Sequence, residues 1–156
     1  MEKLNLTAEP GKHEIVITRS FDATPEQLFK VMTDPTLIPR RWGPRRLTTT
    51  VDCMEFRKGG LWRFLQRDAE GNEFAFNGVY HPIAPPEQLV YTFEFEGLPG
   101  QIMLETVTLT SQDGKTLLTD SSVFQSVQDC DGMLMSGMET GAAETLERLS
   151  ELLQKA

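Results

Sequence analysis

Residues 126–154 read SVQDCDGMLMSGMETGAAETLERLSELLQ, and this stretch decides the fold that we expect. Its apolar side chains recur at steps of three and four, which is the spacing of one face of a helix. Polar residues such as Glu144, Arg148 and Glu151 fall on the opposite face. The pattern predicts one long amphipathic helix, whose apolar face carries Met135, Met138, Ala142, Leu146, Leu149 and Leu153.

Three glycines, Gly132, Gly137 and Gly141, fall in the first half of this predicted helix. Each costs a helix interior about 1 kcal/mol relative to alanine, so a structural gain must offset them. Glycines beside flexible methionines fit two alternatives: a strand approaches closely, or the helix faces an open space that methionine side chains line. The helix sequence by itself leaves both alternatives open.

The residues before this helix predict a sheet interrupted by two short helices. Residues 13–21 alternate as a strand, Thr24-Pro25 begins a helix that reaches Met32, and Leu37, Ile38 and Trp42 indicate a second helix that Gly43-Pro44 ends. Six further strands follow, separated by turn residues, at about residues 47–54, 61–67, 73–83, 89–96, 102–110 and 115–125. Seven antiparallel strands with helices on one side make an α+β domain.

The length of 156 residues suits one domain, which we place at residues 12–156 after a loose tail at 1–11. The net charge of -8 argues against a nucleic-acid partner, because such binding needs a basic surface. There is no apolar run near 18 residues and no signal-peptide pattern, so we expect a cytoplasmic protein without a membrane span. Cys53 and Cys130 have no close spacing and are expected to be free thiols.

The sequence shows no constellation of catalytic or metal-binding residues. His13 and His81 are the only histidines, which leaves no His-rich metal site, and no cofactor motif occurs. Several carboxylates lie on predicted strands, and any that pointed into an apolar pocket would have its pKa raised. Nothing in the spacing pairs two of them, and strand carboxylates are expected on the solvent face; they are Glu55, Glu73, Glu94, Glu105 and Asp120.

The order of elements, together with four short motifs, resembles the SRPBCC (START / birch-pollen-allergen-like) superfamily. The motifs are Trp42-Gly43-Pro44, Gly59-Gly60-Leu61-Trp62, Gly78-Val79-Tyr80-His81-Pro82-Ile83 ahead of Pro86-Glu87-Gln88-Leu89-Val90, and Ser136-Gly137-Met138-Glu139-Thr140-Gly141. Within the superfamily, the chain is similar to the branch of the carboxy-terminal domain of the activator of heat-shock protein 90 ATPase. This resemblance implies a helix-grip fold: a seven-stranded curved antiparallel sheet around a long C-terminal helix, with two short helices after strand 1 and an internal pocket near them.

Both the residues and the resemblance lead us to expect that the protein binds a hydrophobic small molecule, as a carrier or sensor without catalysis. An aromatic residue often follows the second helical glycine in that branch, and Ala142 stands there in this chain, which leaves a larger pocket or one filled from elsewhere. The predicted pocket residues are Trp42, Trp62, Phe76, Tyr91, Phe93, Phe124, Met135, Met138 and Gly141, and the predicted rim for an anionic head group is Arg41 and Arg45.

Two other functions stay open. The resemblance implies a co-chaperone-like protein that activates a heat-shock protein 90 class ATPase, with a role in the stress response, and it also covers polyketide cyclase-like enzymes, a small-molecule cyclase or hydrolase. The sequence leaves a monomer and a homodimer equally open.

Overall fold

Eight strands form one antiparallel sheet in the computed structural model, which describes residues 3–155. Their order across the sheet is β1-β2-β8-β7-β6-β5-β4-β3. The strands are β1 (Asn5–Thr7), β2 (Glu14–Phe21), β3 (Thr48–Met54), β4 (Leu61–Arg67), β5 (Glu73–Ala84), β6 (Gln88–Phe95), β7 (Ile102–Gln112) and β8 (Lys115–Val123). The helices are α1 (Pro25–Thr33), α2 (Ile38–Arg41), α3 (Val127–Met135) and α4 (Met138–Lys155).

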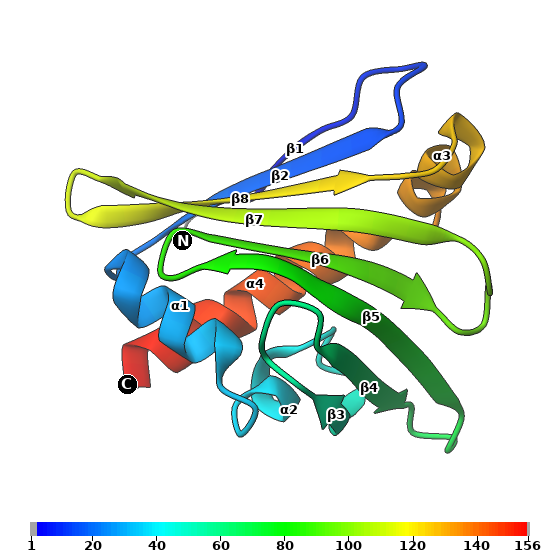
Figure 1. Ribbon diagram of the computed structural model, residues 1–156, viewed down its shortest axis with the longest axis horizontal. Helices are drawn as coiled ribbons and strands as arrows, with labels where there is room; N and C mark the ends of the chain where they lie inside the picture. The colour runs from blue at the N-terminus through cyan, green and yellow to red at the C-terminus, as the bar shows by residue number, and fades with distance from the viewer. Residues whose placement is uncertain (1–2, 156) are drawn as a thin grey trace.

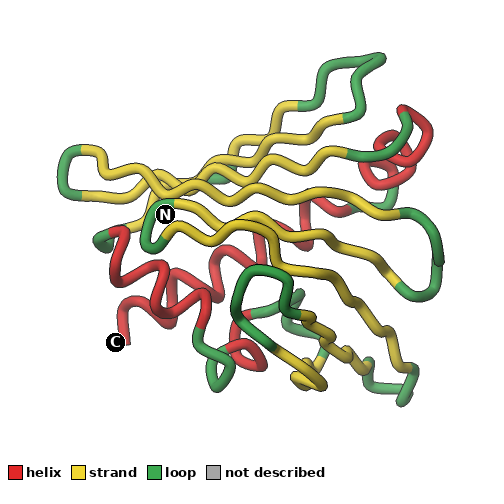
Figure 2. Tube along the Cα trace, viewed as in Figure 1, coloured by secondary structure: helices red, strands yellow, loops and turns green. Residues whose placement is uncertain are grey.

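The sheet curves, and helices lie against it as a second layer. Figure 1 shows α4 running behind the middle strands, with α1 and α2 beside its C-terminal half and α3 at the opposite end. Figure 2 shows the strands as one continuous layer that no helix interrupts. This arrangement confirms the α+β helix-grip fold expected from the sequence. No helix among residues 3–155 is long and apolar enough to cross a membrane.

The strand count differs from the expectation by one. Asn5–Thr7, in the segment expected to be a loose tail, pairs with β2 in the register Leu6↔Ile17 and adds an eighth, edge strand. Backbone pairing needs no side-chain pattern, so three residues beside an existing strand edge can join a sheet without a signal in the sequence.

The start of α1 follows its sequence signal closely. The Thr24 hydroxyl accepts a hydrogen bond from the Gln27 N–H at 3.1 Å, and the Gln27 side chain accepts one from the Thr24 N–H at 2.9 Å. This reciprocal pair satisfies two backbone groups that would otherwise lack partners at a helix N-terminus. With Pro25 at the first helical position, local residues alone fix where α1 begins.

The prediction of one long C-terminal helix is wrong, because the chain breaks between α3 and α4. Gly137 has φ +83°, a left-handed conformation that glycine adopts without the steric cost of a Cβ. Before it, the Ser136 hydroxyl donates to the Met133 carbonyl at 2.6 Å and helps to end α3. The side chains of α3 and α4 therefore do not lie on one continuous helical face. The residues that face the sheet differ from those that a single unbroken helix would place there.

The core divides into two apolar clusters on the helical side of the sheet. The larger one joins β4 to β8 with α1, α2 and α4, and includes Leu28, Trp62 and Leu149. The smaller one lies under α3, where Ile15, Phe124 and Cys130 are buried. Both clusters border the space between the sheet and α4.

Candidate functional site

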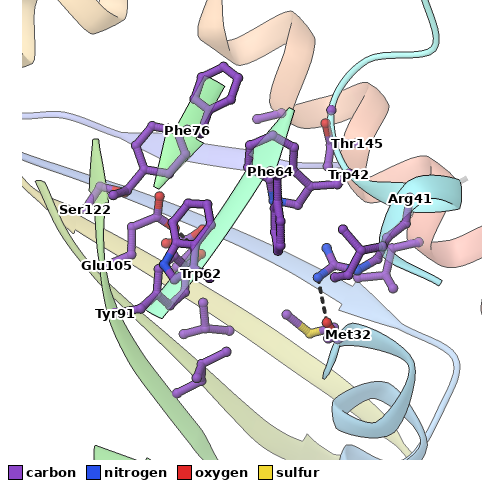
Figure 3. Close-up of a pocket in the computed structure, with 18 of the residues that line it drawn as sticks. Met32, Arg41, Trp42, Trp62, Phe64, Phe76, Tyr91, Glu105, Ser122 and Thr145 are labelled. Carbon is purple, nitrogen blue, oxygen red and sulfur yellow. Dashed lines mark hydrogen bonds between the residues drawn. The ribbon is translucent and has the colours of Figure 1, made fainter. Parts of the chain in front are cut away.

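A cavity of about 340 Å³ lies between the concave side of the sheet and α4. Its walls come from strands β2 to β8, from the α1–α2 segment and from α3 and α4. Figure 3 shows Arg41 and Met32 on the helical side, Tyr91 and Glu105 on the sheet side, and aromatic rings between them. The volume lies within the range of about 300 to 1,000 Å³ typical of small-molecule sites.

Aromatic side chains from four elements make one wall of the cavity. The Trp42 ring contacts Phe64 and Phe76 edge-on, with centroids 5.2 Å apart in each case, and Trp62 lies 5.9 Å from Phe93. The indole N–H of Trp62 donates to the Thr92 carbonyl at 3.2 Å. Gly78 lies beneath this contact, where a Cβ would collide with the Thr92 carbonyl and the Trp62 indole.

The backbone at Trp42 is held from two sides. The Thr49 hydroxyl donates to the Trp42 carbonyl at 2.8 Å, and Arg148 of α4 donates to the Gly43 carbonyl, also at 2.8 Å. Strand β3 and helix α4 therefore fix the segment after α2 in a single position. This segment carries Trp42 into the cavity wall, next to Arg41 at the end of α2.

Seven of the nine residues predicted for the pocket line this cavity. They are Trp42, Trp62, Phe76, Tyr91, Phe93, Phe124 and Met138. Met135 does not, since its side chain is 87% exposed at the end of α3. The cause is the break at Gly137, which leaves Met133 of α3 and Ala142 of α4, neither of them predicted, facing the cavity.

Gly141 also lies outside the cavity wall. A Cβ built at this position meets no atom within 4 Å, so neither a close strand nor the cavity accounts for the glycine. Its neighbour Ala142 lines the cavity, and the small side chain there leaves volume that an aromatic residue would fill.

The two arginines predicted for a rim have separate positions. Arg41 lines the cavity, donates from Nη2 to the Met32 carbonyl at 2.6 Å, and has a buried Nε without a hydrogen-bond partner among residues 3–155. Burial lowers the Arg41 pKa to about 10, so the guanidinium is charged at neutral pH. Within the described part of the chain, no carboxylate lies within 4.0 Å of it.

Arg45 lies on the outside, so its assignment to the cavity rim is corrected. Its side chain forms an exposed ion pair with Glu151 at 2.6 Å, and its backbone N–H donates to Glu144. Gly43, with φ +83°, turns the chain away from the cavity before Arg45. Arg45 borders a second, polar hollow with Arg40, Arg148 and Lys155.

Two carboxyl groups meet in the cavity, contrary to the expectation that strand carboxylates face solvent. Glu105 of β7 is 7% exposed and accepts a hydrogen bond from the Tyr91 hydroxyl at 2.6 Å. Asp120 of β8 is its diagonal neighbour in the sheet, and each carboxyl group affects the pKa of the other. Both carboxyl groups line the cavity.

The surroundings of this pair favour one shared proton. Burial raises the pKa of Asp120 well above its usual range, and the Glu105 charge raises it further. Burial also raises the pKa of Glu105, while the hydrogen bonds from Tyr91 and Asp120 act in the opposite direction. Burial and the closeness of the two groups therefore favour a single negative charge on the pair.

The sequence contains a signal for this pair that the predictions did not use. Alternate residues of a strand point to the same face of a sheet. Glu105 alternates with Met103 and Val107, and Asp120 alternates with Leu118 and Phe124; these four apolar residues all face the core. Sheet register then makes Glu105 and Asp120 diagonal neighbours, because Glu105 pairs with Ser122 and Val107 pairs with Asp120. Among residues 3–155, His, Cys, Asp and Glu side chains form no group of three that could hold a metal ion.

Comparison with known proteins agrees with this architecture. The family described as "Activator of Hsp90 ATPase homolog 1-like protein" matches residues 22–154. The chain belongs to this family. Its membership confirms the resemblance to the SRPBCC superfamily and the branch expected from the sequence motifs. No curated protein matches the chain.

Solved structures of similar proteins share the helix-grip fold. A crystal structure of a protein from Rhodobacter sphaeroides is 27% identical, with a TM-score of 0.90 over 99% of this chain and 99% of the other. A solution structure of a protein from Arthrobacter aurescens is 24% identical, with a TM-score of 0.88 over 97% of this chain and 92% of the other. Both structures thus match the present chain along nearly its whole length.

Proposed function

We propose that the protein binds a hydrophobic small molecule with an anionic end in the cavity between the sheet and α4, as a carrier or sensor. The observation that carries this proposal is the cavity itself, with aromatic and methionine walls and a few converging polar groups. Transfer of an apolar molecule from water into such a space is favourable in proportion to the area removed from water. Family membership supports a ligand-binding fold.

The anionic end follows from Arg41. Arg41 is half-buried, its Nε is buried without a hydrogen-bond partner among residues 3–155, and no carboxylate of the described residues pairs with it. A guanidinium binds carboxylates with well-aligned, charge-assisted hydrogen bonds. A carboxylate on the ligand would supply the missing negative charge beside the guanidinium.

Filling the cavity tests the proposal. The replacement Ala142→Phe places a ring in the cavity, whereas Ala143→Phe, one residue later on α4, points outward from an exposed position. We expect Ala142→Phe to reduce binding of the fluorescent probe N-phenyl-1-naphthylamine at least tenfold and Ala143→Phe to leave it unchanged. Equal effects of both replacements, or no probe binding by the wild-type protein, would contradict the proposal.

One observation supports the cyclase or hydrolase alternative: the Glu105–Asp120 pair places a carboxylate and a carboxylic acid side by side in the cavity. Such a pair can accept and donate protons in acid–base catalysis. The chaperone alternative rests on the family description. Its test is the ATPase rate of a heat-shock protein 90 class chaperone with and without this protein.

A further inference from the structure

The carboxyl groups of Glu105 and Asp120 lack a positively charged partner. Among residues 3–155, no arginine, lysine or histidine side chain lies within 4.0 Å of either group. The Tyr91 hydroxyl donates to Glu105 at 2.6 Å, but a neutral donor does not balance a charge. Carboxylates that are removed from water are usually paired with a cation. The proposed function uses Arg41 and leaves the negative charge of this pair unexplained.

The open space of the cavity reaches Asp120. This residue is half-buried, although its neighbours in the sheet register, Ile17 on β2 and Val107 on β7, are both buried. All three side chains lie on the inner face of the sheet and line the cavity. Because neighbours with the same orientation are buried, the exposed part of Asp120 faces the cavity. Ser122, the next inward residue on β8, is half-buried and lines the cavity too.

Three oxygen-bearing side chains converge on this part of the sheet. Glu105 and Ser122 are directly opposite in the β7–β8 register, and Asp120 is the diagonal neighbour of Glu105. Figure 3 shows Ser122 and Glu105 together on the sheet side of the cavity. A primary ammonium group has three N–H donors and no acceptor, so it can donate to all three side chains. A ligand hydroxyl has one donor and leaves the negative charge unbalanced.

Aromatic rings beside these oxygens also favour a cation. Phe76, Tyr91 and Phe93 are half-buried residues that line the cavity, and the rings of Phe76 and Phe93 lie 5.5 Å apart. The hydroxyl of Tyr91 joins this group of rings to Glu105. The face of an aromatic ring attracts a cation within about 6 Å of its centroid. One region of the wall therefore offers both a negative charge and aromatic rings.

We propose that the ligand carries a primary ammonium group, which donates to the Glu105–Asp120 pair and to Ser122. This inference rests on the proposed function and adds a second charged anchor on the sheet side of the cavity. Figure 3 shows Arg41 on the helical side, across the aromatic rings from Glu105. The ligand is then a zwitterion with its two charges at opposite ends of an apolar body, as in a long-chain ω-amino acid.

Matched probes with and without an amino group test the second anchor. An ammonium group that enters an apolar cavity without a negative partner loses its hydration and weakens binding. A preference for the amino form thus requires a negative partner in the cavity. Octanoate, decanoate and dodecanoate, each paired with its ω-amino form, cover three spans between the two anchors.

Calorimetric titration at pH 7 gives the dissociation constants. For at least one chain length, we expect the ω-amino acid to bind the wild-type protein at least fivefold more tightly than the plain acid. If plain acids bind and are preferred at every length, the ammonium anchor is wrong and the proposed function stands. If neither kind of acid binds, the proposed anionic hydrophobic ligand is wrong, and the zwitterion with it.

Variants of the pair then locate the negative charge. Glu105→Gln combined with Asp120→Asn removes the charge with little change in shape, and should abolish the fivefold preference while plain acids still bind. Each single replacement leaves one carboxylate to carry the charge and should retain the preference. Glu139→Gln combined with Asp113→Asn, two exposed residues outside the cavity wall, is the matched control. A preference that survives in the double variant of the pair, or is lost in the control, would overturn the assignment.

A serine replacement tests the third acceptor. Ser122→Ala removes one oxygen and keeps the charge, so we expect the preference for the ω-amino acid to fall at least twofold without disappearing. Ser121→Ala changes the preceding residue, whose hydroxyl donates to Glu14, and should leave the preference unchanged. Equal preferences in Ser122→Ala and the wild-type protein would remove Ser122 from the proposed site.

Discussion

Two regions of the molecule each hold an arginine, one buried and one half-buried, and only the first has an ion-pair partner among the described residues. Near the end of β2, Arg19 is 5% exposed, pairs with Glu147 of α4 at 2.8 Å, and lies over the Phe21 ring at 4.5 Å from its centroid. In the cavity, Arg41 has only the Met32 carbonyl as a hydrogen-bond acceptor among residues 3–155. The first arginine joins the sheet to α4, whereas the second lines the cavity without a carboxylate partner among the described residues.

This difference separates a structural charge from one suited to binding. A buried ion pair is satisfied within the chain, and the loss of either partner exposes the cost of burying the other. A cation that is removed from water without a carboxylate partner already has this unfavourable free energy of desolvation. An anionic ligand can offset it. The predictions below test this distinction through stability in the first region and through stability and binding in the second.

The largest expected effect comes from breaking the structural pair. Glu147→Ala leaves Arg19 buried without a carboxylate and should lower the free energy of unfolding by about 3 kcal/mol. Urea denaturation followed by circular dichroism measures this change. The double variant Arg19→Met with Glu147→Leu removes both charges and should recover much of the loss. If Glu147→Ala changes the stability by less than about 0.5 kcal/mol, the comparison with Arg41 fails.

A smaller effect should appear as a pH dependence of stability from the cavity carboxyl pair. The folded pKa of Asp120 is raised by burial, so above about pH 4 the unfolded chain releases a proton that the folded protein keeps. The free energy of unfolding should therefore fall with rising pH, by up to about 1.4 kcal/mol per pH unit, until the folded pKa is reached. Glu105 contributes in the same direction.

The variant Asp120→Asn isolates this effect, because it cannot release the proton. We expect its free energy of unfolding relative to wild type to rise steadily between pH 5 and pH 7 in urea titrations. Asp113→Asn is the control, since this residue lies in the β7–β8 turn with φ +49°, a conformation that asparagine tolerates. A constant difference between Asp120→Asn and wild type across this range would show that Asp120 is ionised in the folded state.

The smallest expected change in stability follows replacement of the cavity arginine. Arg41→Met loses one hydrogen bond to Met32 and removes an unpaired buried charge, so the free energy of unfolding should change by less than about 1 kcal/mol. Binding should change far more: calorimetry should show decanoate binding at least tenfold more weakly while decanol is unaffected. Arg45→Met is the matched control outside the cavity. If Arg41→Met weakens the binding of decanoate and decanol equally, Arg41 contributes only to the shape of the cavity wall and not to recognition of the carboxylate.

Local sequence predicted the elements of this fold well. The alternation in 89–96 corresponds to β6, and the Thr24-Pro25 signal corresponds to the start of α1. These features depend on residues close together in the chain, since capping, turn geometry and strand alternation act over a few positions. The aromatic part of the cavity wall followed from the same alternation.

The site's polar chemistry was decided by tertiary structure. Glu105 and Asp120 stand fifteen positions apart, and only the β7–β8 register makes them diagonal neighbours on the cavity face. The sequence marks Arg41 and Arg45 as equivalent, yet the turn at Gly43 sends one into the cavity and the other to Glu151.

The sequence by itself thus determined seven of the eight strands, the short helices, the family and an apolar wall, because local patterns and motifs encode them. The tertiary structure alone decided the break at Gly137, the exposure of Met135 and the meeting of one cation with two carboxyl groups in a single cavity. The physical reason is that a glycine's φ, a strand's register and a side chain's burial depend on contacts between residues distant in the chain.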